Sequence, residues 1–495
     1  MIYLSGMRKL FSSVFLLYSI NLFSQQQNTL AIREHCKKNE TGILDEFVSF
    51  LSIPNVSADT PNIHKNAAFI VQMMRNRGIQ NVQLLDGISQ GVAPVVYGEV
   101  KSAGAKQTIV FYAHYDGQPV NPAQWMAGFS PFVPKYQNDR IYARGSSDDK
   151  GGVAAILNAY EAIVKTGMKP TVNIKFFFEG EEEVGSPKLG EILEKNNELL
   201  QSDAWIICDG PVHQSGKKQI VFGVRGDAHL DLTVYGPKRP LHSGHYGNWA
   251  PNPALMLAKL LASMKDESGR VTVNGFYDDV TPLSEAELKA LKDVPSADEQ
   301  MKNELGLAAI EMPGKSLSES INLPSLNING MQSGNVGKMA SNQIPTFANA
   351  VMDLRLVLGN DWKKQQQKVI DHIKLQGFTV IDHEPTDAER NKYAKLIKVI
   401  AGENSYNAQR TSMNLPIAKS IIEAVRSTTS EQVVLQPTLG GSLPLIVIEN
   451  YLHAKTITVP IANHDNNQHA ENENIKLANF WSGIETMAAL MMMKN

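Results

Sequence analysis

The chain has 495 residues, more than one compact core usually holds, so we expect two or three domains. Its 47 basic and 50 acidic residues leave a net charge of −3, which does not suggest nucleic acid or an anionic membrane surface as a partner. Only two cysteines occur, Cys36 and Cys208, which excludes a disulfide-rich scaffold and a cysteine-based zinc cluster and leaves one bridge open.

The amino-terminal residues 1–24 differ in composition from the rest of the chain. Arg8 and Lys9 precede an apolar stretch that ends at Ser24, and three glutamines follow it. This order is typical of a secretory signal peptide, with a buried amino-terminal helix as the alternative. We expect cleavage after Ser24, a secreted or periplasmic protein, and no membrane association once the signal is removed. No other run is long and apolar enough to span a membrane.

Predicted helices and short apolar strands alternate as far as residue 223. The spacing of apolar residues predicts helices at residues 34–52, 66–77, 153–166 and 188–200. β-Branched and aromatic runs predict strands at residues 107–112, 171–178 and 204–208. Such alternation indicates an α/β fold with a helix-covered, mostly parallel sheet.

The pattern changes after about residue 223. Residues 229–235 and 348–357 alternate between apolar and polar side chains, as strands with one exposed face do. With helices at 253–264 and 362–375, they predict an α+β insertion of ferredoxin-like β-α-β-β-α-β order. From about residue 416 the buried α/β pattern resumes and continues to a terminal helix.

Acidic and histidine side chains gather at the ends of the predicted strands. The run Glu181-Glu182-Glu183 directly follows the strand at 171–178. Ligands bind at the carboxyl ends of strands in open α/β sheets, and adjacent carboxylates repel one another unless a cation meets them. Other strand ends and loops contribute His114, Asp116, Asp148, Asp149, Asp209 and a cluster within residues 463–473.

This combination of side chains favours a metal site. Imidazole with carboxylates suits Zn²⁺, and more carboxylates than one ion needs suit two ions that share a bridge. Two such ions can hold a hydroxide nucleophile and polarise a scissile carbonyl, while a carboxylate beside them takes a proton. Taken singly, each residue is a weak signal, because a lone histidine is more often structural than a ligand and acidic loop residues are usually solvated.

Five motifs together resemble those of a known family. They are His114-Tyr-Asp116, Arg144-Gly-Ser-Ser-Asp-Asp-Lys-Gly151, Glu179-Gly-Glu-Glu-Glu-Val-Gly-Ser186, Leu241-His-Ser-Gly244 and His469-Ala-Glu-Asn-Glu473. Their order is similar to that of the dinuclear-zinc exopeptidases of peptidase family M20, which include carnosinase-type dipeptidases, bacterial carboxypeptidases, aminoacylases and succinyl-diaminopimelate desuccinylase. The resemblance spans about residues 35–495.

The resemblance implies a domain arrangement and a cofactor. Residues 25–223 and 411–495 would form a catalytic α/β domain, interrupted by an α+β lid domain at residues 224–410. The lid commonly also forms a homodimer in that family. Two divalent ions are implied, Zn²⁺ first, with Mn²⁺ or Co²⁺ as alternatives.

The resemblance also implies metal ligands. Asp148 would bridge the two ions, and the peptide bond that follows it would be cis. His114 and Asp209 would complete one site, and Glu183 and His469 the other, with His464 as a competitor of His469.

The remaining catalytic and substrate-binding roles come from the same motifs. Glu182 would be the general base for a metal-bridged hydroxide, and Asp116 would orient His114. His242, or alternatively His245, would stabilise the oxyanion, often across a dimer. The residues implied to contact a substrate carboxylate are Arg355, which could instead be a strand-surface arginine, and Asn342, Gly440, Gly441 and Ser442.

Two departures from the family pattern bear on the substrate. Leu439 stands where several dipeptidases have an acidic residue, which weakens the case for a free substrate amine. Asp209 stands where deacylases tend to have glutamate, which favours the dipeptidase branch. We expect an exported exopeptidase that hydrolyses dipeptides or short peptides next to a free carboxylate. The alternatives are an N-acyl-amino-acid hydrolase and an inactive peptide-binding relative.

Overall fold

The computed structural model describes residues 27–87, 93–441 and 445–494, so the predicted signal peptide at 1–24 lies outside the described residues. The chain divides into two compact units. The first comprises the residues before Gly223 together with Thr411–Gln436 and Val447–Asn495; the second comprises Gly223–Arg410 and Pro437–Ile446. Residues 437–446 thus group with the second unit, whereas the sequence placed them with the carboxyl-terminal part of the first. The Leu439 N–H donates to the Gly223 carbonyl at 2.8 Å, which ties this turn to the second unit.

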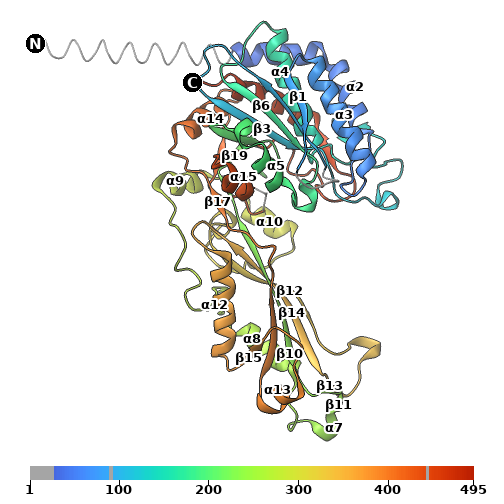
Figure 1. The fold of residues 1–495 in the computed structure, drawn as a ribbon, viewed down its shortest axis with the longest axis vertical. Helices are drawn as coiled ribbons and strands as arrows, with labels where there is room; N and C mark the ends of the chain where they lie inside the picture. The colour runs from blue at the N-terminus through green and yellow to red at the C-terminus, as the bar shows by residue number, and fades with distance from the viewer. Residues whose placement is uncertain (1–26, 88–92, 442–444, 495) are drawn as a thin grey trace, which may run out of the picture. The chain divides into compact units, whose positions relative to one another are not determined.

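The first unit is built on an eight-stranded sheet (Figure 1). Its strands are, from edge to edge, β1 (Gln80–Leu85), β2 (Val95–Val100), β6 (Asn173–Glu179), β3 (Thr108–His114), β7 (Ala204–Ile207), β19 (Thr456–Thr458), β8 (Gln219–Val221) and β18 (Val434–Gln436). The four neighbours β6, β3, β7 and β19 run parallel, whereas β1, β2 and β6 pair antiparallel, as do β19 and β8. The expected α/β class is confirmed, with a mixed sheet that is parallel at its centre.

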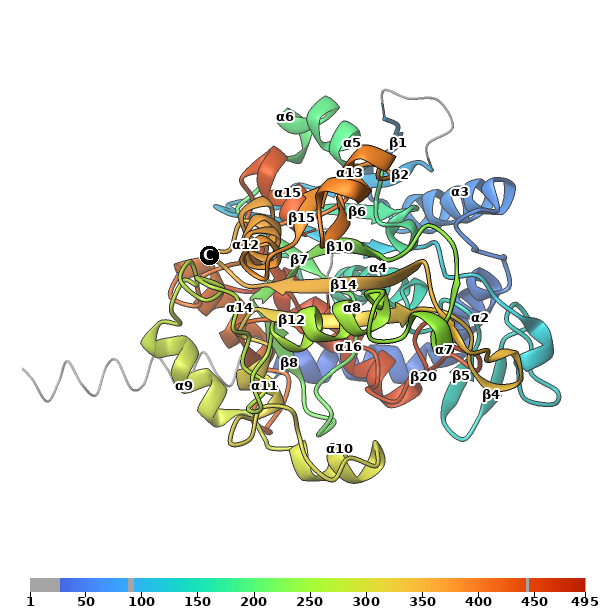
Figure 2. The same ribbon diagram turned by 90° about the horizontal axis from the view of Figure 1, so that it is seen from below.

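Helices cover both faces of this sheet. Residues 27–38 are helical, and the further helices are α2 (Glu40–Leu51), α3 (Thr60–Asn76), α4 (Lys150–Lys165), α5 (Leu189–Lys195), α6 (Asn197–Leu200), α14 (Pro416–Arg426), α15 (Leu445–Leu452) and α16 (Leu477–Met491). Figure 2 shows α5 and α15 on one side of the sheet and α4 and α16 on the other. Across the described residues, none of these helices combines the length and apolarity that crossing a bilayer requires.

Helix α4 approaches the sheet closely because Gly151 and Gly152 in its first turn have no side chain. A Cβ atom at Gly152 would lie 2.3 Å from the Asp149 Oδ1 and 2.7 Å from the Cys208 carbonyl oxygen. The Asp149 carboxylate caps the helix by accepting from the Gly152 N–H at 3.1 Å. The turn that precedes α4 is therefore held against the carboxyl end of β7. Cys208 is buried there and, like Cys36, is free.

The second unit carries a five-stranded sheet of order β12 (Ser325–Gln332), β14 (Phe347–Leu356), β10 (Gly226–Tyr235), β16 (Leu396–Ala401) and β15 (Thr379–Ile381). With helices α8 (Pro253–Ala262) and α12 (Trp362–Leu375), the first four strands have the expected ferredoxin-like order, and all pair antiparallel. β15 extends the edge in parallel with β16.

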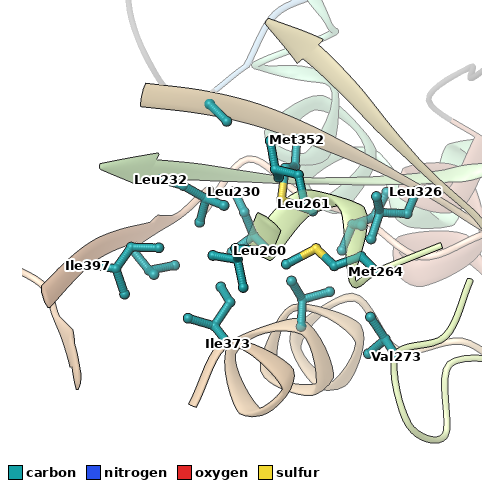
Figure 3. Packing of buried hydrophobic residues seen from close by; sticks show 14 of the residues in the cluster. Leu230, Leu232, Leu260, Leu261, Met264, Val273, Leu326, Met352, Ile373 and Ile397 are labelled. Atoms are coloured by element: carbon teal, nitrogen blue, oxygen red, sulfur yellow. The ribbon is translucent and has the colours of Figure 1, made fainter. Parts of the chain in front are cut away.

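Alternating residues of this sheet form the core of the second unit. Figure 3 shows Leu230 and Leu232 of β10 and Met352 of β14 near Leu260 of α8 and Ile373 of α12. All five are at most 2% exposed, and burying each side chain contributes about 1.5–3 kcal/mol. The other face of β10 and β14 carries mostly polar residues, together with the exposed apolar Phe347 and Val351 of β14.

Smaller elements complete the two units. In the first unit these are η1 (Pro122–Gln124), β4 (Lys135–Gln137), β5 (Arg140–Tyr142), η2 (Glu182–Val184) and β20 (Asn474–Lys476). In the second they are β9 (Gly223–Val224), β11 (Leu241–His242), α7 (Ser243–Tyr246), α9 (Glu285–Asp293), α10 (Asp298–Glu304), α11 (Leu317–Ser320), η3 (Gly337–Met339), β13 (Gln343–Ile344), α13 (Asp387–Lys392) and β17 (Gln409–Arg410).

Candidate metal centre

The predicted metal ligands of the first unit meet because of strand order. His114 ends β3, Glu182 and Glu183 follow β6, and Asp209 follows β7. These three strands are parallel neighbours, so their carboxyl ends lie at one edge of the sheet. Asp148 reaches the same edge from the turn before α4, and His469 from the loop that follows β19.

Two groups of potential ligands share Asp148. One consists of His114, Asp148 and Asp209, and the other of Asp148, Glu183 and His469; within each, the ligand atoms lie within 4.8 Å of one another. The His114 Nε2 is 2.9 Å from the Asp148 Oδ1 and 3.8 Å from the Asp209 Oδ2. The His469 Nε2 is 3.0 Å from the Asp148 Oδ2 and 3.1 Å from the Glu183 Oε2. Each oxygen of the Asp148 carboxylate therefore faces a different histidine.

The backbone and the neighbouring residues fix these side chains. The peptide bond between Asp148 and Asp149 is cis, as the resemblance implied. The Asp116 Oδ1 lies 3.3 Å from the His114 Nδ1, on the side of the ring opposite to Asp148. The two oxygens of Asp116 also accept from the N–H groups of Glu182 at 3.2 Å and of Glu183 at 3.1 Å. Asp116 thus orients an imidazole and the glutamate turn together.

Burial and close charges shift the pKa values at this centre. Burial raises the pKa of Asp209 to about 7 and raises that of Glu182 well above its usual value. Burial also acts to raise the pKa of Asp148, but hydrogen bonds with His114 and His469 outweigh it and lower this pKa. Hydrogen bonds to Asp148 and Glu183 raise the pKa of His469 to about 10.

These properties fit divalent cations. Asp148, Asp209 and His114 are at most 3% exposed, so at least two carboxylates are almost completely removed from solvent. Several buried carboxylates at one point repel one another, and a divalent ion neutralises them. Mixed imidazole and carboxylate donors are those that Zn²⁺ and related ions prefer. The cluster includes His469 and not the competing His464, which appears in no such group among the described residues.

The predicted substrate-binding residues lie in the second unit and fall into two places. Arg355 of β14 is opposite Asp227 of β10, and its Nε is 3.2 Å from the Asp353 Oδ2. Gly440 and Gly441 follow Leu439, which pairs with Val224 just before β10 begins, at the same end of the sheet as Arg355. The predicted contact at Ser442 lies outside the described residues.

His242 and Asn342 lie together at the other end of this sheet. The N–H of Ser243, the residue after His242, donates to the Asn342 carbonyl at 2.9 Å. β13, which follows Asn342, leads into β14 at Phe347, and Phe347 to Arg355 spans about 25 Å of extended strand. His245 lies beside His242, with ring centroids 4.7 Å apart. The structure therefore does not bring His242 or Asn342 near Arg355 within one chain.

Three supporting residues were not singled out from the sequence. The Ser57 hydroxyl donates to the Asp116 Oδ2 at 2.8 Å, and the Gln118 amide donates to the Glu183 Oε2 at 2.8 Å. Glu473 is buried beneath Asp148 and accepts from its N–H at 3.0 Å. No sequence pattern around Ser57 predicts this contact, because its partner Asp116 is 59 residues away in the chain. Glu473 is the last residue of the motif His469-Ala-Glu-Asn-Glu473, and Gln118 lies two residues after the motif His114-Tyr-Asp116. Their position in or beside these motifs was the only sequence feature that could have pointed to them.

Comparisons with known proteins are consistent with this geometry. A model of the family described as peptidase family M20/M25/M40 matches residues 110–493. The Cys-Gly metallodipeptidase DUG1 of Candida albicans is 27% identical over 463 residues, which cover 89% of this chain and 92% of that protein. The human β-Ala-His dipeptidase is 28% identical over 417 residues, covering 83% and 79%. The crystal structure of an M20 family metallo-carboxypeptidase from Sulfolobus solfataricus is 30% identical with a TM-score of 0.74, covering 91% of this chain and 98% of that one.

Proposed function

This chain belongs to peptidase family M20/M25/M40 and is a metal-dependent hydrolase, and on that premise we propose that it is a two-ion exopeptidase for dipeptides or short peptides with a free carboxylate. The observation that carries the proposal is the sharing of Asp148 between two histidine-carboxylate groups. The similarity to Cys-Gly and β-Ala-His dipeptidases over most of the chain supports the dipeptide substrate.

The residues of the two groups would hold the ions. His114, Asp148 and Asp209 would bind one, and Asp148, Glu183 and His469 the other. When bound, such a pair of ions lowers the pKa of a water molecule and polarises the scissile carbonyl. We propose Zn²⁺ for both positions, with Mn²⁺ and Co²⁺ as alternatives, because the donors are imidazole and carboxylate.

Glu182 is proposed to move the proton. Its carboxylate lies outside both ligand groups, yet its Oε2 is 4.0 Å from the His114 Nε2. Its backbone is held by Asp116, so the side chain starts from a fixed point. A carboxylate in this position accepts the proton of the attacking water at Oε2 and returns it to the leaving amine. Asp116, on the other side of His114, directs the Nε2 of that ring toward Asp148.

A panel of substrates tests this reaction and its alternatives. The purified chain is stripped of metal, reloaded with Zn²⁺, Mn²⁺ or Co²⁺, and given free dipeptides, carboxyl-blocked dipeptides and N-acyl amino acids. We expect turnover of free dipeptides and little turnover of carboxyl-blocked ones. Preference for N-acyl amino acids would instead establish the acylase alternative. Binding without turnover of any substrate would leave only a peptide-binding protein.

Arg355 is proposed to bind the free carboxylate of the substrate. A planar guanidinium donates two parallel hydrogen bonds to a carboxylate, whereas an ammonium group cannot. Arg355→Lys is therefore expected to raise KM for free dipeptides about tenfold, which corresponds to about 1.4 kcal/mol, with a smaller change in kcat. Steady-state kinetics measures both constants. An unchanged KM would make Arg355 a strand-surface residue held by Asp353.

We further propose a homodimer in which His242 acts at the partner chain's metal centre. Within the second unit His242 lies far from Arg355, and the edge strand β12 exposes Ile328 (41%) and Met331 (51%). Unpaired strand edges with exposed apolar residues are suited to association. His242→Ala and Glu182→Ala, each inactive alone, are expected to regain about a quarter of the parent activity when dissociated, mixed and reassociated. The reason is that half of the dimers are then mixed and each has one complete site.

Light scattering measures the mass of the assembly in the same samples. A monomer, or a dimer whose mixed form shows no recovered activity, would contradict a shared site.

Export is also proposed, on the basis of the basic residues Arg8 and Lys9 and the apolar stretch that ends at Ser24. Mass spectrometry of the protein from expressing cells is expected to find a mature chain that begins at Gln25. An intact amino terminus on the exported or accumulated protein would contradict this.

A further inference from the structure

Glu473 lies at the junction of the two loops that carry Asp148 and His469. It directly precedes β20, which pairs antiparallel with β5. The Glu473 carbonyl accepts from the Ala143 N–H at 3.1 Å, which extends this pairing by one residue on each strand. The strand pair therefore fixes the backbone of Glu473 beside residues 144–148, in the turn that presents Asp148.

The side chain of Glu473 has no exposed surface and is surrounded by donors. Its Oε2 accepts from the Arg144 Nη1 at 2.8 Å and the Gly145 N–H at 3.0 Å. Its Oε1 accepts from the Ser147 N–H and hydroxyl, both at 2.9 Å, and from the Asp148 N–H at 3.0 Å. Successive N–H groups that converge on one anion form a nest, and here the anion belongs to the protein itself. A buried carboxylate is stable only when it is satisfied in this way.

The same residue anchors the loop that carries His469. This loop is closed at its base by a hydrogen bond from the Asn474 N–H to the Asn466 carbonyl at 2.9 Å. His469 lies four residues before Glu473, its side chain is 55% exposed, and its backbone is in the left-handed region with φ of 60°. His114 and Asp209, in contrast, are placed by β3 and β7. Of the ligands in question, His469 depends most on the anchor of its loop.

We propose that Glu473 is a positioning residue whose carboxylate sets the separation between Asp148 and His469 and thereby forms the ion site of Asp148, Glu183 and His469. The inference rests on the two-ion function proposed above. The buried Glu473 carboxylate joins the turn 144–148 to the loop 463–473, so that the Asp148 Oδ2 and the His469 Nε2 lie 3.0 Å apart. Loss of this junction is expected to weaken the His469 side of the centre before the His114 side.

Glu473→Gln tests the proposal with almost no change of shape. All five partners of Glu473 donate, and the amide nitrogen of glutamine is itself a donor. In one orientation it faces Arg144 and Gly145, and in the other it faces the N–H groups of Ser147 and Asp148. The variant is expected to bind one Zn²⁺ per chain at concentrations where the parent binds two, with the second ion's affinity lowered about 10–100-fold.

Native mass spectrometry counts the ions, and circular dichroism checks that the variant is folded. Glu471→Gln is the matched control, because it removes the same charge from the same loop two residues away and is expected to keep two ions. Ser147→Ala removes only the hydroxyl donor and is expected to lower the second ion's affinity less than Glu473→Gln does, with the fold intact.

Two ions bound with parental affinity in folded Glu473→Gln would overturn the proposal. If that variant does not fold, an unchanged second-ion affinity in Ser147→Ala would overturn it instead. A parent chain that binds no ion would refute the proposed function itself, so the two failures are distinguishable.

Discussion

Glu182→Ala is expected to lower kcat by roughly 10²–10⁴-fold while both ions remain bound. The Glu182 carboxylate belongs to neither ligand group, so its removal takes away a proton acceptor and no donor to a cation. Its neighbour Asp116 accepts from the backbone N–H of residue 182, so the substitution leaves that hydrogen bond in place. Steady-state kinetics combined with a count of bound zinc measures the two effects separately.

The adjacent residue provides the matched control. Glu183 faces His469 at 3.1 Å and belongs to the second ligand group, so Glu183→Ala is expected to lose one ion. The two neighbouring glutamates should therefore differ in metal content although both variants lose activity. Equal metal content in the two variants would mean that their roles have been assigned wrongly.

Asp148→Asn is expected to weaken the binding of both ions and to reduce kcat/KM by about 10³-fold or more. The reason is that two bound metal ions contribute several kcal/mol to transition-state stabilisation. Each oxygen of Asp148 faces a different histidine, so one neutral amide disturbs both sites. Asp209→Asn removes the same charge from one group alone and is expected to weaken one ion. Isothermal titration of the stripped chains with Zn²⁺ measures both affinities.

A different result for this pair would change the description of the centre. If Asp148→Asn and Asp209→Asn each lost a single ion, Asp148 would not be shared between the two sites. If Asp148→Asn kept both ions, the ligand groups would have to be assembled from other side chains.

Much of the fold and the metal centre could be predicted because the signals are local. The strand that ends at His114 and the strand before Glu181 are apolar runs whose lengths are set by the sequence itself. Parallel order then places their carboxyl ends together, so a cluster at one sheet edge could be inferred without distances. The roles within Glu181-Glu182-Glu183 needed the family resemblance, since the physics of adjacent carboxylates does not rank them.

The rest depends on contacts between distant segments. The Glu473 carboxylate accepts from the Asp148 N–H although the two residues are 325 positions apart in the chain. The spacing of apolar and polar residues does not predict such a contact. Residues 437–446 group with the second unit, and Leu439 among them pairs with Val224, which lies 215 positions earlier in the chain. Likewise, His242 and Arg355 belong to one predicted set, and only the register of β14 shows how far apart they lie.

Peptide hydrolysis at the Asp148 centre is proposed to require two bound ions. The most direct test titrates the metal-stripped chain with Zn²⁺ and measures, in the same samples, ions per chain by native mass spectrometry and the rate of free-dipeptide hydrolysis. We predict that the rate rises to its plateau as the second ion binds, at two ions per chain. A plateau at one ion per chain, or hydrolysis by the stripped chain, would contradict a two-ion reaction.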